Sequence, residues 1–245
     1  MERLDKVLSN LGYGSRKEIK AMVKNKMIKV DGEIARDSGM SIDPEKCILY
    51  VGEEEVKYKR YIYLMMNKPS GVISATYDPR DKTVIDLLKI EHAVFNPFPV
   101  GRLDKDTVGL LLLTNDGELN HKLISPKWHV DKVYYAEIDG VVTEEDIKYF
   151  YKGVTLDDGY KCLPGKLKIL KTYEQTSKVL VTIQEGKFHQ VKRMFQSVNK
   201  TVTFLRRISF GPLNLDESLK EGEYRELTDR EVDMLKSGKN EINIM

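Results

Sequence analysis

The stretch "GRLDKDTVGLLLLTNDGEL", residues 101–119, places a dense group of charges directly before a run of leucines. The run 110–114 is long and apolar enough to form a fully buried strand, and the turn-forming residues 115–117 end it. The charged residues before it are Arg102, Asp104, Lys105 and Asp106. Charges beside a buried segment are costly unless they are paired. The stretch therefore predicts a buried strand whose entrance holds paired charges.

Strands and helices are mixed along the chain around this run. Strand patterns occupy "YIYLMMNKPSGVIS" (61–74, two strands about a turn at 69–71), "KVYYAEIDG" (132–140) and "SKVLVTIQEG" (177–186). Helix patterns occupy "KFHQVKRMFQSV" (187–198) and a last segment capped by Thr228 and Glu231. Because these elements show no regular β-α-β alternation, we expect an α+β domain rather than a doubly wound sheet.

The N-terminal residues predict a separate small unit of two helices and a hairpin. Apolar residues at helical spacing are Leu4, Val7, Leu8 and Leu11 in the first helix, and Ile19, Met22, Val23 and Met27 in the second. Ser15 and Glu18 form a capping-box pattern before the second helix. Asp31 and Gly32 are typical of a tight turn between two strands.

Basic residues are concentrated in this unit. Residues 1–36 carry nine Lys/Arg against five Asp/Glu, a net charge of +4, whereas the whole chain carries +2. A lysine stripe is often only a solvated helix face. Its position on a compact helical unit favours a phosphate-binding surface instead. The residues we expect to bind phosphate here are Arg16, Lys17, Lys20 and Lys24.

Composition narrows the class of protein. The chain has 245 residues with 41% apolar content, typical of a soluble protein with one or two domains. We expect domains at 1–50 and 61–245 with a charged linker at 51–60. No apolar run reaches membrane-spanning length, and the first residues lack the apolar core of a secretory signal. With only two cysteines, a cytoplasmic protein is the simplest expectation. The absence of heptads favours a monomer.

Metal and phosphate sites fit the charged stretch poorly. "DKDTVG" begins like an EF-hand loop, but position 108 is Val, and Asn115 stands where a bidentate Glu is required. The glycine spacing of a phosphate-binding loop is absent. The histidines have no evident partners for a metal or a Ser/His/Asp site; they are His92, His121, His129 and His189. We therefore predict no metal site.

The remaining explanation for the charged stretch is a carboxylate with a functional role. Asp104 or Asp106 could simply cap a turn. However, a carboxylate held near cations stays ionised and can act as a nucleophile or base. On a helical wheel, one face of 188–198 gathers Phe188, Val191, Met194, Phe195 and Val198. Lys192 borders this face and can either extend to water or meet a buried carboxylate, whereas Arg193 points away from it.

The residues alone do not decide which of two adjacent tyrosines faces a pocket. Tyr134 and Tyr135 are adjacent in a strand, so their side chains point to opposite faces and only one can face a given pocket. Either ring could equally be a core residue whose hydroxyl reaches the surface.

Several of these segments, in this order, resemble a bacterial ribosomal RNA pseudouridine synthase, in particular the branch that acts on the small-subunit RNA. They are the S4-type start "RLDKVLSNLGYGSRKEIKAMVKNKMIKVDGEIA", "MNKPSGV", "GRLDKDTVGLLLLTNDG", "KVYYAEI", "EGKFHQVKRMF" and "RRISFGPLNLDESLKEGEYREL". The resemblance implies an S4-type RNA-binding domain followed by a catalytic domain with a mixed, mainly antiparallel sheet flanked by helices. It further implies that no metal or organic cofactor is needed.

The same resemblance implies roles for individual residues. Asp104 would be the catalytic aspartate, Tyr134 the tyrosine against the uracil ring, and Lys192 the cation that pairs with the aspartate. Arg102 would orient the loop or the flipped nucleotide, and Arg193 would face the RNA. The expected substrate is one uridine of 16S rRNA, free or within a small-subunit assembly intermediate. The alternatives are a sister enzyme acting on 23S rRNA and a non-catalytic RNA-binding assembly factor.

Overall fold

The computed structural model describes residues 1–238, which form two compact units. Met1–Ile62 with Leu88–Asn96 make up the first unit, and Tyr63–Leu87 with the chain from Pro97 onward make up the second. Residues 239–245, the end of the expected catalytic domain 61–245, lie outside the described part. No helix in the described part is long and apolar enough to cross a bilayer.

The first unit contains the two expected helices and hairpin. The helices are α1 (Leu4–Asn10) and α2 (Arg16–Lys24), and the strands of its main sheet, in the order β3-β2-β5-β6, are β2 (Ile28–Val30), β3 (Glu33–Ile34), β5 (Leu49–Val51) and β6 (Glu54–Glu55). A second pair joins β1 (Glu2–Arg3) to β4 (Ser41–Ile42). The Ser15–Glu18 capping box is present, and positive φ angles of 51° and 83° at Asp31 and Gly32 make the tight turn.

Two expectations for this region differ from the structure. Met27 is not in the core: it follows α2 and is 44% exposed. Part of the segment 51–60, expected as a linker, is sheet, because β5 runs to Val51 and pairs with β6 across the turn at Gly52. The charged segment "GEEE" indicates a linker because it lacks apolar residues. Strands exposed to water need few apolar residues, so this short hairpin gives no strand pattern.

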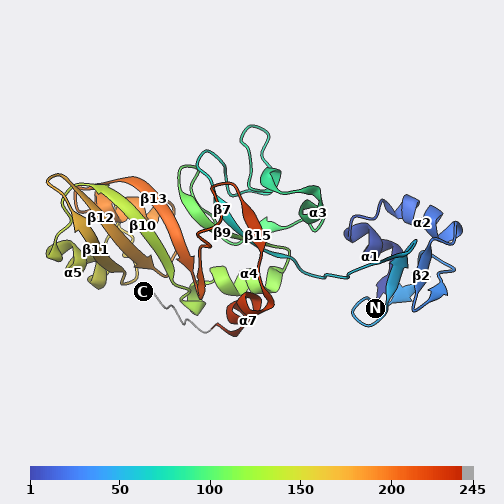
Figure 1. The fold of residues 1–245 in the computed structure, drawn as a ribbon. Helices are drawn as coiled ribbons and strands as arrows, with labels where there is room; N and C mark the ends of the chain where they lie inside the picture. Colours follow the sequence, from blue (N-terminus) through green and yellow to red (C-terminus); the bar gives the residue numbers. More distant parts are fainter. Residues whose placement is uncertain (239–245) are drawn as a thin grey trace. The chain divides into compact units, whose positions relative to one another are not determined.

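The second unit is built on one large sheet (Figure 1). Its main strand order is β11-β12-β10-β13-β9-β7-β15, with β8 paired to β9 and β14 paired to β13. The strands are β7 (Tyr63–Lys68), β8 (Phe98–Pro99), β9 (Val108–Thr114), β10 (Lys132–Asp139), β11 (Lys166–Thr172), β12 (Thr176–Ile183), β13 (Thr201–Phe210), β14 (Leu213–Asn214) and β15 (Tyr224–Glu226). Among the strands of residues 1–238, β9 and β13 form the one parallel pair, which confirms the mixed, mainly antiparallel α+β class.

The leucine run is confirmed as a buried strand. All residues of β9 are buried, and the strand begins at Val108 rather than at Leu110. It lies between β7 and β13, and its parallel pairing with β13 covers only Val108 and Gly109. A Cβ on Gly109 would lie 2.3 Å from the Arg207 carbonyl oxygen, and the φ of Gly109 is +102°. Only glycine allows the two strands to approach so closely.

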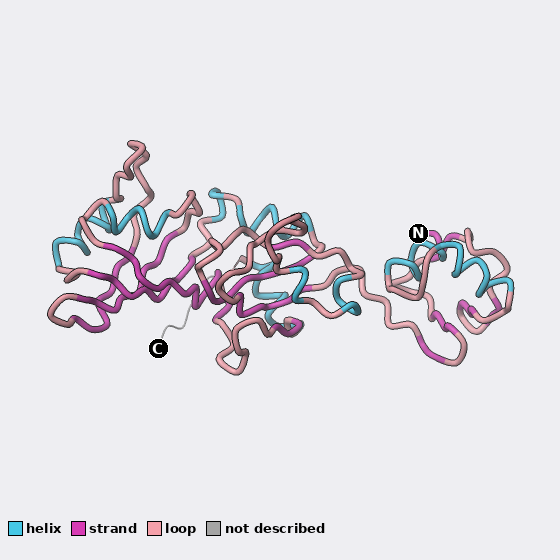
Figure 2. The backbone as a smooth tube through the Cα atoms, turned by 90° about the horizontal axis from the view of Figure 1, so that it is seen from above, coloured by secondary structure: helices cyan, strands magenta, loops and turns pink. Residues whose placement is uncertain are grey.

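Helices lie beside the sheet, as the view from above shows (Figure 2). They are α4 (Gly117–Ile124), α5 (Glu144–Lys152), α6 (Gln190–Gln196) and α7 (Asp229–Ser237), with α3 (Ile90–Ala93) in the first unit and 3-10 turns at Ile85–Leu87 and Pro126–Trp128. Leu119 and Leu123 of α4 and Leu235 of α7 pack into the core formed with β7 and β9. Helix α5 packs on β11, α6 packs on β13, and the rings of Phe150 and Phe195 are 5.0 Å apart.

Further differences concern element boundaries. The expected strand after the turn at 69–71 is reduced to a single bridge between Ile73 and Thr83. The turn at 115–117 is the start of α4, whose N-cap Asp116 accepts from the Leu119 N–H. Phe188 precedes α6 and is 67% exposed, so it does not belong to the apolar face. The wheel assumed a helix two residues too long at this end.

Candidate active site

The loop 104–107, between the charged stretch and β9, is held by a buried ammonium. Lys68, at the end of β7, is fully buried, and its Nζ donates to the carbonyl oxygens of Pro69 (3.1 Å), Asp104 (3.0 Å) and Thr107 (2.9 Å). A weaker contact of 3.4 Å reaches the Lys105 carbonyl oxygen. Burial lowers the pKa of Lys68 to about 8, although the carboxylates of Asp106 and Asp104 act in the opposite direction. The loop therefore takes its shape from main-chain oxygens gathered around one cation.

A second anchor fixes the residue before Asp104. The Ser74 hydroxyl donates to the Leu103 carbonyl oxygen at 2.9 Å and accepts from the Leu103 N–H at 3.0 Å. With both sides of the loop held, the Asp104 carboxylate is directed into a pocket, where its side chain is 29% exposed. It is neither in open water nor fully buried.

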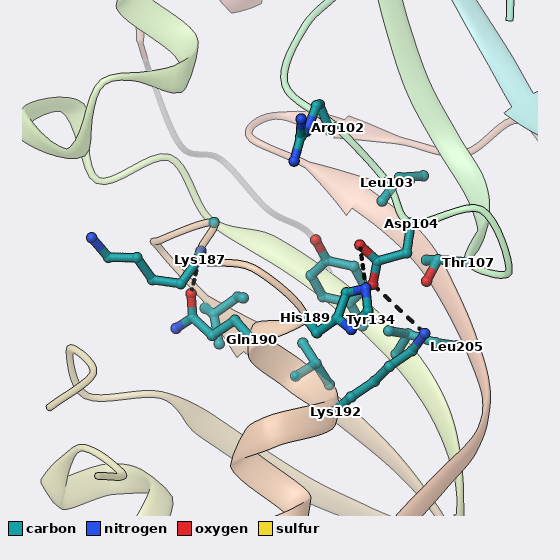
Figure 3. Close-up of a pocket in the computed structure, with 13 residues that line it drawn as sticks. Arg102, Leu103, Asp104, Thr107, Tyr134, Lys187, His189, Gln190, Lys192 and Leu205 are labelled. Atoms are coloured by element: carbon teal, nitrogen blue, oxygen red, sulfur yellow. Dashed lines mark hydrogen bonds and ion pairs between the residues drawn. The ribbon is translucent and has the colours of Figure 1, made fainter. Parts of the chain in front are cut away.

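Two cationic or potentially cationic groups face Asp104 (Figure 3). Lys192 Nζ lies 3.6 Å from Asp104 Oδ2, and His189 Nε2 lies 3.7 Å from Asp104 Oδ1. Lys192 makes shorter contacts of 2.6 and 2.7 Å to the two carboxylate oxygens of Asp106. These bonds lower the pKa of Asp106. Lys192 thus reaches the carboxylate for which it was predicted, but its closer partner is Asp106.

Helix α6 supplies both of these groups. Val191, Met194 and Phe195 are buried beneath it, as the wheel predicts, and Lys192 projects at the edge of that face. His189, at the N-cap, has the left-handed angles φ 48° and ψ 33°, a strained conformation for a residue with a side chain. The predicted lack of a partner for His189 is wrong, because the chain reversal before α6 brings its ring to Asp104.

Arg193 points away from the pocket, also as the wheel predicts. Its guanidinium is paired with Asp157 and lies 2.7 Å from the Asp158 carboxylate, and its side chain is 14% exposed. The RNA-facing role expected for Arg193 gains no support from this arrangement, since its charge is already matched within the chain. It ties α6 to the loop that carries the two carboxylates.

Tyr134 lines the same pocket as Asp104, and Tyr135 does not. Tyr135 points to the other face of the sheet, donates to Glu137 at 2.8 Å and meets the Phe204 ring edge-on. The pocket has a volume of ≈ 60 Å³ and its apolar walls include Ile183, Val191 and Leu205. Figure 3 shows Tyr134 beside Asp104 and His189. A planar ring that enters would meet the tyrosine and the carboxylate together.

A second, larger cavity shares walls with the first. Its volume is ≈ 330 Å³, and both are lined by Arg102, Tyr134, Gly186 and Lys187. Lys132 and Arg207 also line the larger cavity. Tyr134 and Arg207 are paired residues of β10 and β13, and Lys132 stands two residues before Tyr134, so all three lie on one face of the sheet.

A buried carboxylate organises the wall between β12 and α6. Glu185 accepts from the Tyr160 hydroxyl at 2.5 Å, the Leu163 N–H at 2.8 Å and Gln190 Nε2 at 3.1 Å. The bond to Glu185 raises the pKa of Tyr160 to about 12. Both carboxylate oxygens are thereby occupied by donors of the chain. Glu185 fixes the segment that leads to Lys187 and His189.

Apart from Arg193, the basic residues expected to contact RNA are at the surface. Arg102 is exposed at the rim of the pocket, on the opposite side of Asp104 from Lys192 in Figure 3. In the first unit, α2 exposes its four basic side chains, which are Arg16, Lys17, Lys20 and Lys24, together with Glu18 and Ala21. Within residues 1–238, no cluster of three or more His, Cys, Asp or Glu side chains could hold a metal ion.

The sequence matches known proteins over nearly its whole length. The family "RNA pseudouridylate synthase" matches residues 62–197, and the S4 domain matches residues 2–46. The chain belongs to the RNA pseudouridine synthase family. An uncharacterized RNA pseudouridine synthase of Bacillus subtilis (strain 168) is 50% identical, with 95% of this chain and 98% of that protein covered.

Two further relatives of this pseudouridine synthase carry more specific names. The ribosomal large subunit pseudouridine synthase B of Bacillus subtilis (strain 168) is 38% identical, covering 98% of this chain and 99% of its own. The ribosomal small subunit pseudouridine synthase A of Escherichia coli (strain K12) is 36% identical, covering 94% of this chain and 98% of its own. A crystal structure of a pseudouridylate synthase is 34% identical with a TM-score of 0.67, covering 96% of this chain and all of the other.

Sequence reasoning missed several groups in and around this synthase's two cavities. His189 and Asp106 were not predicted to lie near Asp104 and Lys192, because these contacts depend on the loop 104–107 and on the chain reversal before α6. Lys132 could have been found, since strand alternation puts it on the same face as Tyr134. Arg207 lies on a strand whose register with β10 contains a bulge, and no sequence signal gives that register.

Proposed function

We propose that this enzyme converts one uridine of ribosomal RNA to pseudouridine, with Asp104, Tyr134 and Lys192 as its catalytic residues. The observation that carries the proposal is the Asp104 carboxylate, which faces Tyr134 across one pocket and has Lys192 and His189 within 4 Å. The matches to the synthase family support the reaction class.

The reaction is an isomerisation, so its atoms balance without a further reactant. The bond from N1 to the ribose carbon breaks, the base turns within the pocket, and C5 bonds to the same carbon. C5 then loses its proton, and N1 ends with one. The target base must leave the RNA stack to enter the pocket, at a cost of about a few kcal/mol.

Each residue has a distinct part in this chemistry. Asp104 starts the reaction, at the ribose or at the base. Tyr134 packs against the uracil ring and receives the C5 proton. Lys192 holds the charge of Asp104 while its shorter bonds to Asp106 keep the ammonium in place. Arg102, at the rim, orients the flipped nucleotide.

Remote phosphate contacts would come from the first unit. We assign them to Arg16, Lys17, Lys20 and Lys24, which are exposed on α2. Such contacts strengthen binding without reading sequence. Replacing the three lysines with Gln should lower the slope of log K against log salt by about 2 to 3, as expected for three phosphate contacts. An unchanged slope would remove the assignment.

The target we propose is 16S rRNA, bound by a monomer, free or in a small-subunit assembly intermediate. A relative named for the small subunit, 36% identical, supports this target. The second candidate is 23S rRNA, favoured by a relative named for the large subunit at 38% identity. Mapping pseudouridine in both RNAs of a strain that lacks the gene decides between them: the missing modification identifies the substrate.

The decisive test is Asp104→Asn, assayed by tritium release from RNA labelled at C5 of uridine. The variant should bind rRNA while its turnover falls by about 10³-fold or more. Asp106→Asn is the matched control, because it shares the Lys192 contact but does not line the pocket. It should keep activity within about tenfold of the parent protein. Equal losses of turnover in both variants would show that the effect comes from the charge around Lys192 rather than from Asp104. If the parent protein itself releases no tritium, the result would favour a non-catalytic assembly factor.

A further inference from the structure

The larger cavity beside the target pocket has an unusual charge. Four cationic side chains line it, those of Arg102, Lys132, Lys187 and Arg207, against the single carboxylate of Glu185. Both Glu185 oxygens already accept bonds from Tyr160, Leu163 and Gln190. Within residues 1–238, no ion pair joins any of the four cations to a carboxylate.

Two of these cations are held in place by the chain and still have hydrogen-bond donors without an acceptor. Lys132 donates to the carbonyl oxygens of Val130 (3.0 Å) and Gln184 (3.3 Å), which leaves one of its three protons without a partner. Arg207 is 2% exposed, and its Nε donates to the Leu110 carbonyl oxygen at 2.7 Å. One terminal nitrogen of Arg207 has no hydrogen-bond partner. The ring of Phe210 lies near both cations and offsets only part of their charge.

Unmatched cations of this kind are costly to the fold. Burial and the neighbouring Arg207 charge lower the pKa of Lys132 to about 8, although the carboxylates of Asp131 and Glu185 act in the opposite direction. A buried charge without a counter-charge is costly. The ammonium of Lys68 is retained because main-chain oxygens surround it, whereas Lys132 and Arg207 have donors left over for an anionic ligand. The cavity thus fits an anion that arrives with the substrate.

We propose that this cavity is a nucleotide subsite, which holds the phosphodiester and the base that adjoin the target uridine. This inference rests on the proposed function. The phosphodiester would lie against Lys132 and Lys187, above the buried guanidinium of Arg207. The base would lie against the apolar walls given by Ile124, Tyr160 and Phe210. The volume of ≈ 330 Å³ is in the range of small-ligand sites.

Continuity of the RNA strand argues for this occupant. The two cavities share four lining residues, so the second cavity lies within reach of a nucleotide bonded to the target uridine. Flipping the target out of the stack also removes one stacking partner from its neighbour. A cavity with both cations and aromatic walls compensates the neighbour for that loss, because bases stack readily on aromatic rings and phosphates bind lysines.

The first test compares Lys132→Met with Lys168→Met on a stem-loop RNA that contains the mapped target uridine. Lys168 is an exposed lysine of β11 in the same sheet, so both variants lose one positive charge. Lys132→Met should raise KM and Kd by about tenfold, with kcat changed much less, and should lower the salt slope by about 0.7, as one single-strand phosphate contact predicts. Lys168→Met should change Kd less than about twofold.

A stability measurement separates binding from structure. If Lys132 serves the ligand, Lys132→Met leaves the midpoint of urea unfolding unchanged or raises it, since the variant loses an unmatched buried charge. A lower midpoint together with a lower kcat would assign Lys132 a structural role and overturn the proposal. Unchanged Kd and salt slope would overturn it as well.

The second test locates the occupant. In the same stem-loop, the phosphate on either side of the target uridine is replaced by an uncharged methylphosphonate. At one of the two positions, the replacement should weaken binding to the parent protein by about tenfold and add little to the Lys132→Met defect. Fully additive effects at both positions would exclude an adjoining nucleotide from the cavity. Because Kd is measured directly, this result does not depend on tritium release, whose absence would count against the proposed function alone.

Discussion

Replacing Lys68 with Met tests whether a buried ammonium shapes the catalytic loop. Methionine has nearly the length of lysine and no charge, so the change removes the donor without leaving a large hole. The parent ammonium donates to carbonyl oxygens of Pro69, Asp104 and Thr107 at 2.9 to 3.1 Å. In Lys68→Met the carbonyl oxygens of Pro69 and Thr107 lose this donor in a buried region, whereas the Asp104 carbonyl oxygen still accepts from the Thr107 N–H at 3.1 Å.

Two opposing effects set the magnitude. The drop in the pKa of Lys68 from 10.5 to about 8 corresponds to a cost of about 3 kcal/mol for keeping the charge buried, which the variant escapes. Two carbonyls left without donors, those of Pro69 and Thr107, cost roughly 1 to 3 kcal/mol each, or about 2 to 6 kcal/mol together. The net expectation is a loss of about 1 kcal/mol, reduced where the loop opens to let water reach the carbonyls.

Opening of the loop carries the functional consequence. Asp104 lies in the same loop, and a displacement of about 1 Å from productive geometry can cost about 10²-fold in rate. Tritium release should therefore fall by about 10²-fold or more, and urea unfolding should show the loss of stability. Lys105→Met is the control, since Lys105 is an exposed member of the same loop whose ion pair with Asp81 is worth about 0 to 1 kcal/mol. The reasoning is refuted if Lys68→Met keeps both the stability and the activity of the parent protein.

Three further outcomes follow from the structure. Gly109→Ala should cost about 3 kcal/mol or more in urea unfolding, because its Cβ meets the backbone of β13, whereas Gly159→Ala, with a similar positive φ but open space, should cost about 1 kcal/mol. Between pH 8 and 10.5 the unfolded chain keeps the Lys132 proton that the folded chain has released, so the unfolding free energy should rise with pH by up to about 3 kcal/mol. Comparison of the parent protein with Lys132→Met isolates this rise. Identical pH profiles for the two proteins would contradict the prediction. Ser15→Ala should lower the free energy of unfolding of the first unit by about 1 kcal/mol through loss of the capping box, with Ser9→Ala, inside α1, as the comparison in thermal melts.

The sequence predicted best where local pattern and burial agree. The leucine run at β9, the capping boxes at Ser15 and Thr228, and the alternating strand at β12 carry their signal in a few neighbouring residues. Lys192 was also predicted at the edge of an apolar face, where the structure has it. In each case, one short window of sequence contains the whole cause.

Prediction failed where the cause lies far away in the chain. Phe188 looks apolar and helical, but the left-handed residue at His189 delays the start of α6. The partners of Lys192 depend on the shape of the loop 104–107, which Lys68 sets from another strand. The unmatched charges of Lys132 and Arg207 depend on a strand register with a bulge. None of these contacts leaves a periodic trace in the sequence.

The short parallel contact between β9 and β13 has a mechanical consequence. The loop that bears Asp104 leads into β9, while Tyr134 belongs to β10, and β13 is the strand that joins these two halves of the sheet. Their backbone pairing covers two residue pairs, and the bond from Arg207 Nε to the Leu110 carbonyl oxygen adds one side-chain link. The distance between the acid and the ring is therefore set by this short contact, so a substitution that shifts β9 against β13 should change the space in which the base must turn.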